Sequence, residues 1–98
     1  MQREEAIAWL RSMGRNASAR DWVLGETILI TVGEPTTADG ITVYPGVVYL
    51  YPIASGAWNL LDCDPNLPNP AETYDNLEVA ARGAHEYVAS KERSRVKP

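Results

Sequence analysis

Carboxylates are the side chains of this sequence whose spacing most readily suggests chemistry. The densest group lies in the segment 62–66 (DCDPN). Its D-x-D-x-N spacing matches the first ligands of a helix–loop–helix calcium site, where oxygens from alternate residues surround the ion. Leu67, however, stands where that loop needs glycine, and Thr73 stands where it needs glutamate. We therefore interpret Asp62 and Asp64 as parts of a solvated acidic loop that contacts a partner, and we predict no dedicated metal site.

Cys63 and His85 are the single cysteine and the single histidine of the chain. The aspartates on either side of Cys63 would raise the pKa of its thiol, whereas a reactive cysteine needs a lowered pKa. Paired carboxylates such as Glu34 with Asp39 could transfer protons, but the sequence indicates no apolar pocket to tune them. A nucleophile elbow and a glycine-rich phosphate loop are also missing from the sequence. We therefore expect no catalytic residues and no cofactor.

Charge is distributed unevenly along the chain. The formal net charge is −4 over 98 residues, but all nine basic residues lie outside positions 21–81. Nine acidic residues lie within those positions, so the middle carries −9 and the two ends together +5 (nine bases, four acids). Such a separation of charge affects which partners the protein attracts and how fast they associate, but it does not indicate the fold. It favours a basic partner, although selection for solubility alone would also produce acidic loops.

Length and composition predict one small folded domain over residues 1–98. Hydrophobic residues make up 45% and charged residues 22% of the chain, which is typical of globular proteins. No apolar run approaches the roughly 20 residues that span a bilayer, and the first residues do not resemble a secretory signal. A single cysteine excludes an internal disulfide framework. We expect a cytoplasmic protein that does not contact a membrane.

Two segments show the three- and four-residue apolar spacing of amphipathic helices. The first covers residues 3–13. The second begins near Asp75, which could form a capping box with Glu78. From Lys91 onward the chain is basic and loses the apolar spacing, so we predict a disordered tail over residues 91–98.

Three segments alternate in hydrophobicity as strands do: 28–32, 41–53 and 57–62. Segment 33–40 (GEPTTADG) is typical of a turn, and Pro45-Gly46 predicts a bulge or an edge position. Short links between the strands predict an antiparallel three-stranded β-meander. The order α-β-β-β-α then predicts an α+β two-layer sandwich with both helices on one face. Because both parities of the second strand are apolar, we expect the other face to be partly apolar and to form an interface.

The double-stranded RNA-binding domain has the same order of elements, which makes RNA a ligand to consider. That family presents lysines at the start of its second helix, where this chain has Asp75 and Glu78. The loop that enters the minor groove in that family carries Glu34 and Asp39 here. Because phosphate contacts dominate the affinity of such modules, these acids would repel RNA. We predict that the chain binds no nucleic acid.

Aromatic residues indicate how a protein interface could gain affinity. The chain has three Trp, five Tyr and no Phe, and Trp and Tyr combine apolar area with a polar tip. Tyr44 precedes Pro45 and lies on the parity opposite Val43 and Val47, which makes it our preferred interface aromatic. Together with the acidic loops, this predicts the following partner-binding residues: Glu34, Asp39, Tyr44, Asp62, Asp64 and Glu72.

Small size, an acidic middle and the α-β-β-β-α order resemble the immunity proteins of bacterial toxin–immunity systems. The resemblance covers the whole chain and rests on no diagnostic motif. It implies a cytoplasmic protein that binds a cognate, basic toxin domain and covers its active surface, with acidic loops replacing the charge of the toxin's substrate. The alternatives are a small acidic secretion chaperone that binds an effector segment, or a carboxylate-based enzyme or metal-binding domain. The oligomeric state stays open.

Overall fold

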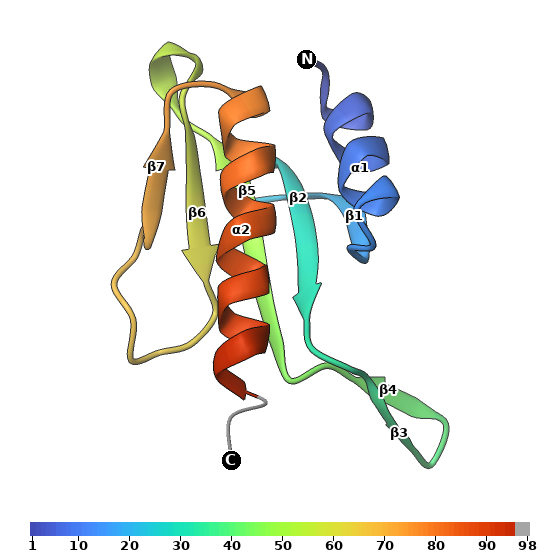
Figure 1. Ribbon diagram of the computed structural model, residues 1–98. Coiled ribbons are helices and arrows are strands. Elements are labelled where there is room, and N and C mark those ends of the chain that lie inside the picture. The colour runs from blue at the N-terminus through green and yellow to red at the C-terminus, as the bar shows by residue number, and fades with distance from the viewer. Residues whose placement is uncertain (96–98) are drawn as a thin grey trace.

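The computed structural model, which describes residues 1–95, has an α+β fold with two helices (Figure 1). The elements are α1 (Arg3–Ser12), β1 (Ala17–Trp22), β2 (Gly25–Val32), β3 (Thr36–Ala38), β4 (Ile41–Val43), β5 (Gly46–Pro52), η1 (Ala54–Gly56), β6 (Trp58–Asp62), β7 (Glu72–Tyr74) and α2 (Leu77–Arg95). The α+β class is thus confirmed. Neither helix in the described part of the chain is both long and apolar enough to cross a bilayer.

Five strands form one antiparallel sheet in the order β1-β2-β5-β6-β7. The three strands predicted from the sequence correspond to its centre, β2, β5 and β6, but the prediction of a simple three-stranded meander is wrong. Strands β1 and β7 extend the sheet at its two edges. Strand β1 escaped prediction because only Ala17 of its six residues is buried, so it has no apolar alternation. Strand β7 escaped prediction because it has only three residues, too few for an alternating pattern, and it follows a loop that contains Pro65, Pro68 and Pro70.

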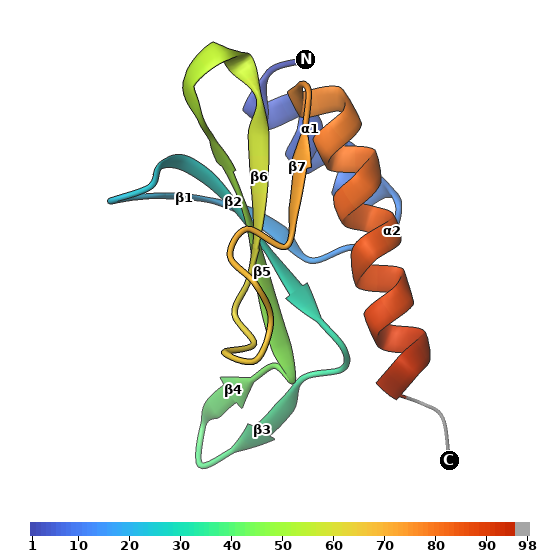
Figure 2. The ribbon, with the colours of Figure 1, turned by 90° about the vertical axis from the view of Figure 1, so that its left-hand side faces the viewer.

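Strands β3 and β4 pair only with each other and form a separate two-stranded hairpin. Asp39 and Gly40 connect them with φ angles of 54° and 77°. Positive φ at both connecting residues is the requirement of a type I′ turn, which Asp-Gly satisfies well. The segment predicted as a turn and the start of the predicted second strand therefore form this hairpin. It projects beyond the end of the main sheet (Figures 1 and 2).

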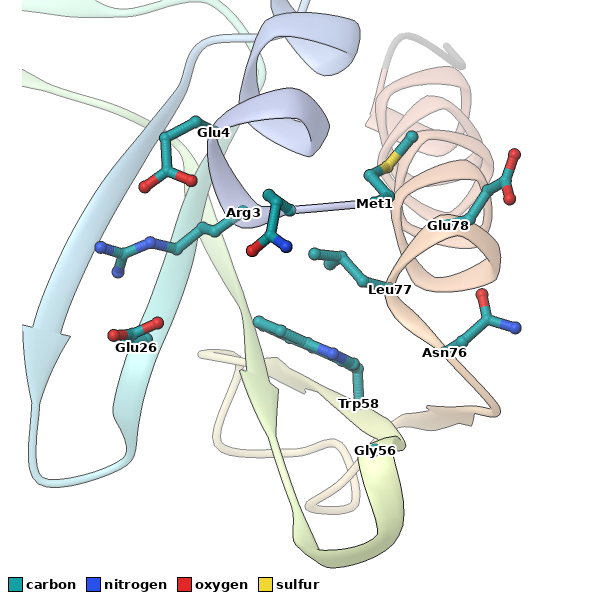
Figure 3. A pocket seen from close by; sticks show the side chains of 10 residues that line it. Met1, Arg3, Glu4, Glu26, Gly56, Trp58, Asn76, Leu77 and Glu78 are labelled. Carbon is teal, nitrogen blue, oxygen red and sulfur yellow. The ribbon is translucent and has the colours of Figure 1, made fainter.

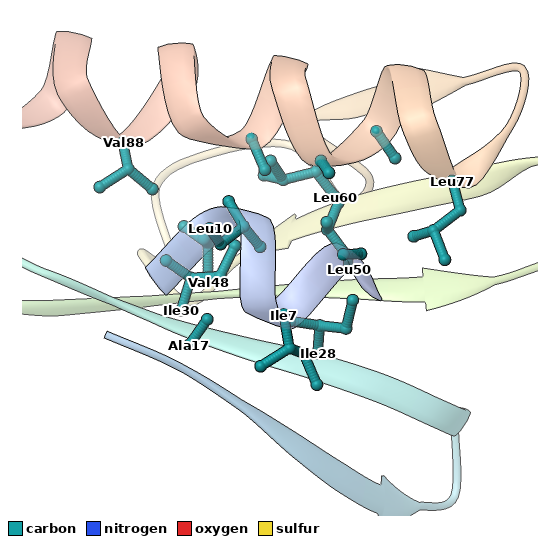
Figure 4. Packing of buried hydrophobic residues seen from close by; sticks show 14 of the residues in the cluster. Ile7, Leu10, Ala17, Ile28, Ile30, Val48, Leu50, Leu60, Leu77 and Val88 are labelled. Carbon is teal, nitrogen blue, oxygen red and sulfur yellow. The ribbon is translucent and has the colours of Figure 1, made fainter. Parts of the chain in front are cut away.

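Both helices cover the same face of the main sheet, as predicted (Figure 2). Alternate residues of the central strands point toward them and form the core (Figure 4). Each fully buried Leu, Ile or Val contributes about 1.5–3 kcal/mol to folding. The large fully buried side chains include Leu10, Ile28, Ile30, Val32, Val48, Leu50, Leu60 and Val88.

Helix α2 differs from the prediction at both ends. Asn76, not Asp75, caps its first turn, because Asn76 Oδ1 accepts a hydrogen bond from the Val79 N–H at 2.9 Å. At the other end the helix continues through Arg95, so the predicted disordered tail is wrong for residues 91–95. The reason is that Lys91 is held by a buried partner on β6. Positions 96–98 of the predicted tail lie outside the described residues.

We expect Gly83→Ala to destabilise the protein, although alanine normally favours a helix by about 1 kcal/mol. A Cβ atom at position 83 would overlap Cε1 of Tyr74, whose ring packs against the core. Relieving this overlap should cost about 1–3 kcal/mol in the free energy of unfolding, measured by urea denaturation. In a Tyr74→Ala background the same change should be neutral or stabilising. A Gly83→Ala single variant that is more stable than the parent would contradict the packing argument.

Candidate functional site

The structure divides the predicted partner-binding residues among three places. Three of them, Glu34, Asp39 and Tyr44, lie in the β3–β4 hairpin and at its base. Tyr44 accepts a hydrogen bond through its hydroxyl from Asn16 Nδ2 at 2.9 Å. Glu34 and Tyr44 both line a cavity of about 370 Å³ at the base of the hairpin. Asp39 lies in the turn at the opposite end.

Asp62 is a buried structural carboxylate and not an exposed contact residue, contrary to the prediction. Its side chain is 3% exposed. Oδ2 accepts hydrogen bonds from Lys91 Nζ and the Tyr87 hydroxyl, each at 2.7 Å, and Oδ1 accepts one from the Asp64 N–H at 2.9 Å. Burial alone raises the pKa of Asp62, but the hydrogen bonds from Lys91 and Tyr87 outweigh this effect and hold the pKa below its usual value. The spacing of Tyr87 and Lys91 on one helix face is the one sequence signal for this site.

Asp64 and Glu72, the remaining predicted residues, lie apart from the hairpin. Asp64 is half-buried and accepts a hydrogen bond from the Asn66 N–H at 2.9 Å, which shapes the loop after β6. Glu72 is exposed on the edge strand β7. Burial, together with the charge of Glu72, raises the pKa of Tyr74 to about 12. Within residues 1–95, no three His, Cys, Asp or Glu side chains are grouped so that they could hold a metal ion.

Cys63 and His85 have different neighbours in the structure. Desolvation and the charge of Asp62 both raise the pKa of the Cys63 thiol, as expected for a cysteine beside carboxylates. His85 lies in α2, where its Nδ1 accepts a hydrogen bond from Arg15 Nε at 3.0 Å and its ring packs edge-on against Trp9. The two side chains therefore have separate structural surroundings.

An ion pair between α2 and the loop after α1 anchors the base of the hairpin. Arg15 Nη1 lies 2.5 Å from Glu92 Oε1. Glu92 Oε2 accepts a hydrogen bond from the Gly33 N–H at 3.0 Å, at the point where β2 leads into the hairpin. Burial alone raises the pKa of Glu92, but the contacts with Arg15 and Gly33 outweigh it and lower the pKa. Sequence reasoning missed this group because its members come from three distant segments.

Acid should destabilise the protein through Asp62 and Glu92. Their pKa values are lower in the folded state than the ordinary 3.8 and 4.5, so the unfolded chain binds more protons in acid. Their contribution is complete above the ordinary values and is lost as the pH falls through the folded values. Urea denaturation at pH 6, 4.5, 3.5 and 2.5 should show this loss, with a shallower loss in an Asp62→Asn/Glu92→Gln variant. Equal slopes for variant and parent would exclude these two carboxyls as the cause.

The face of the main sheet opposite the helices is uncovered (Figure 2). We call it the open face. Arg20 is the charged residue that strand alternation places there, and its guanidinium lies 5.9 Å from the ring centre of Trp22. The rings of Trp22 and Tyr49 lie 5.1 Å apart, centre to centre. The larger aromatic and apolar residues that alternation places on this face are Trp22, Leu29, Val47, Tyr49, Tyr51 and Leu61.

Polar atoms on the open face are held in fixed positions by hydrogen bonds. Thr73 Oγ1 donates to Asn59 Oδ1 at 2.7 Å, and Asn59 Nδ2 donates to the Tyr51 hydroxyl at 3.2 Å. Near the opposite edge of the same face, Trp22 Nε1 donates to Thr27 Oγ1 at 3.2 Å. The side chains at both edges are therefore preorganised, which reduces the entropy lost when a partner binds. The sequence left open which face carries Tyr51, because both parities of its strand are apolar.

A second cavity, of about 640 Å³, lies where the first turns of α1 and α2 approach the β5–β6 turn (Figure 3). Trp58 and Leu77 form part of its wall, and Arg3 extends into it from α1. Arg3 is paired with Asp21. Three carboxylates from different elements also line the cavity, namely Glu4, Glu26 and Glu78. No sequence motif indicates it, because its residues come from four separate segments.

The fold and these sites define a small α+β domain with helices on one sheet face, an open face on the other side and a projecting hairpin. No protein-family model, curated protein or solved structure matches the chain.

Proposed function

We propose that the chain is a protein-binding module that neutralises a cognate, basic toxin domain by covering its active surface. The observation that carries the proposal is the open face, which presents Trp and Tyr side chains. Trp22, for example, stays 39% exposed although it packs against Tyr49. Such aromatic residues provide most of the affinity in many protein interfaces, because they bury a large area and lose few rotamers.

Electrostatics supports a basic partner. Four of the basic residues are held in ion pairs with acids: Arg3 with Asp21, Arg15 with Glu92, Arg82 with Glu78 and Lys91 with Asp62. Glu34 and Asp39, by contrast, are exposed. Exposed negative charge accelerates the encounter with a positively charged protein, whereas the aromatic contacts slow dissociation.

A secretion chaperone is the second candidate, and strand β1 is the observation that favours it. This six-residue strand forms one edge of the main sheet, with most of its residues exposed. An extended effector segment could add to such an edge through main-chain hydrogen bonds. In that case the affinity would depend on the backbone of β1 and not on the aromatic residues of the open face.

The test is neutralisation of the products encoded beside the gene for this chain. Their C-terminal domains are expressed one at a time in a host, with and without the chain. We expect one basic domain to arrest growth and the chain to restore it with submicromolar affinity. Failure of the chain to bind or neutralise any arresting domain would contradict the proposal.

Variants of the open face test how the partner is held. Trp22→Ala/Tyr49→Ala should weaken binding by up to about 1,000-fold, since each hot-spot aromatic contributes about 2 kcal/mol and about 1.4 kcal/mol corresponds to a factor of ten. Glu86→Ala on the exposed side of α2 is the matched control and should bind like the parent. Urea denaturation of each variant separates lost contacts from lost folding. Unchanged binding by the double variant would exclude the open face and favour edge addition at β1.

A further inference from the structure

We propose that the β3–β4 hairpin enters a positively charged cleft of the partner, namely the cleft in which that partner binds its own anionic substrate. We call residues 33–45 the acidic hairpin. The inference rests on the proposed function and specifies which part of the chain would block the active surface.

The two strands of the acidic hairpin project away from the rest of the described chain (Figures 1 and 2). Its strands pair only with each other, and every residue from 34 to 43 is exposed. Ile41 and Val43 are 64% and 59% exposed, although β-branched apolar side chains are normally buried. The apolar side of this hairpin is therefore free to be covered by a partner.

One side of the acidic hairpin is mainly apolar and the other carries threonine hydroxyls. Two different walls of a cleft could contact these two sides. On one side the cross-strand pairs are Thr36 with Val43 and Ala38 with Ile41. On the other side lie Thr37 and Thr42, whose Oγ1 atoms are 3.2 Å apart. A flat partner surface would cover one of these sides, whereas a cleft would bury both.

The negative charge of the acidic hairpin indicates which side chains must line that cleft. Glu34 lies near its base and Asp39 at its tip, and the segment 33–45 contains no basic residue. Carboxylates buried in an interface require hydrogen-bonded cationic partners, because an unpaired buried charge is strongly unfavourable. The complementary cleft therefore presents Arg or Lys side chains, which are the groups that bind phosphate in nucleases and related enzymes.

The base of the acidic hairpin is fixed, so that its direction is set before binding. Gly33 donates its N–H to Glu92, and Tyr44 accepts a hydrogen bond from Asn16. A Cβ atom on Gly33 would lie 2.9 Å from Pro45, so the two ends of the segment are in close contact. A preorganised ridge of this kind loses less conformational entropy on insertion than a mobile loop would.

Photocrosslinking in the native host tests the location. A benzoylphenylalanine is placed at Thr37 in the acidic hairpin, at Tyr51 on the open face, or at Glu86 on α2 as a control. We expect Thr37 to crosslink to a protein through a peptide that lines its substrate-binding cleft and is rich in Arg and Lys. Crosslinks from Tyr51 without any from Thr37 would overturn the hairpin inference and leave the proposed function standing. Crosslinks from neither position would overturn both.

Association kinetics with the crosslinked partner test the charge. Glu34→Gln/Asp39→Asn, which keeps a residue that tolerates positive φ at position 39, should lower the association rate constant about threefold or more at low salt. Asp75→Asn/Glu86→Gln, before and on α2, changes the net charge by the same amount and should have a clearly smaller effect. An equal effect of both variants would show that only total charge matters and would overturn the inference.

Discussion

Alanine in place of Asp62 is expected to lower the free energy of unfolding by about 3 kcal/mol. The side chain is 3% exposed and accepts hydrogen bonds from both Lys91 and Tyr87. Removing it leaves the ammonium group of Lys91, whose side chain is 24% exposed, without its partner, and the Tyr87 hydroxyl without its acceptor. Both losses add to the small cavity that the shorter side chain creates.

Urea denaturation at pH 7 provides the measurement, and Asp64→Ala is the matched control two residues away. Asp64 also accepts a hydrogen bond, but within its own loop, so its loss should cost about 1 kcal/mol. Lys91→Met should restore part of the stability in the Asp62→Ala background, because it removes the unpaired charge. Equal destabilisation by the two alanine variants would contradict a special role for the buried ion pair.

The role of Asp62 changes which carboxylates can serve as probes of partner binding. A charge reversal at position 62 would bury a lysine beside Lys91, so any loss of binding would follow from loss of folding. Asp39 is exposed in a turn, and its side chain has no part in the core. Asparagine at position 39 removes the surface charge, tolerates the positive φ of the turn as aspartate does, and leaves the packing intact. The acidic hairpin is therefore the proper place to test electrostatic steering.

The sequence predicts the part of the fold that is buried, since burial is what produces periodic apolar patterns. Strands β2, β5 and β6 each place alternate apolar residues in the core, and both helices show an apolar stripe. Edge strand β1 faces solvent along most of its length and has no such pattern. The hairpin was not predicted for a different reason. The composition of segment 33–40 led us to interpret the whole segment as one turn, although Asp39-Gly40 is a strong signal for a type I′ turn between two short strands, Thr36–Ala38 and Ile41–Val43.

The candidate site is less predictable than the fold, because its properties depend on contacts between distant segments. Asp62 is acidic and lies at the end of a strand, where an exposed carboxylate would also be expected. Its burial depends on Lys91, 29 residues later along the chain. Likewise, Tyr49 and Tyr51 lie on the open face because both helices pack on the opposite face of the sheet. The spacing of residues within one segment indicates neither the burial of Asp62 nor the face on which the helices pack.

Excision of the acidic hairpin should separate stability from function. In this variant residues 33–45 are replaced by Asn-Gly, which can join β2 to β5 as a type I′ turn because Val32 and Gly46 are already cross-strand partners. The hairpin contributes no residue to the core, so the free energy of unfolding should fall by only about 1–2 kcal/mol. That loss corresponds to the hydrogen bonds that Gly33 and Tyr44 make at its base.

Excision of the acidic hairpin should reduce the affinity for the partner much more than it reduces the free energy of unfolding. The excised chain keeps the open face but loses the segment proposed to fill the partner's cleft, so its affinity for the proposed toxin domain should fall about 100-fold and its ability to restore growth should disappear. Asp62→Ala supplies the comparison, since it should cost more stability than the excision while the folded fraction still binds with normal affinity. Isothermal titration at a temperature where both variants are folded measures the difference. Normal affinity of the excised chain would place the whole interface on the sheet, because the open face would then be sufficient without the hairpin.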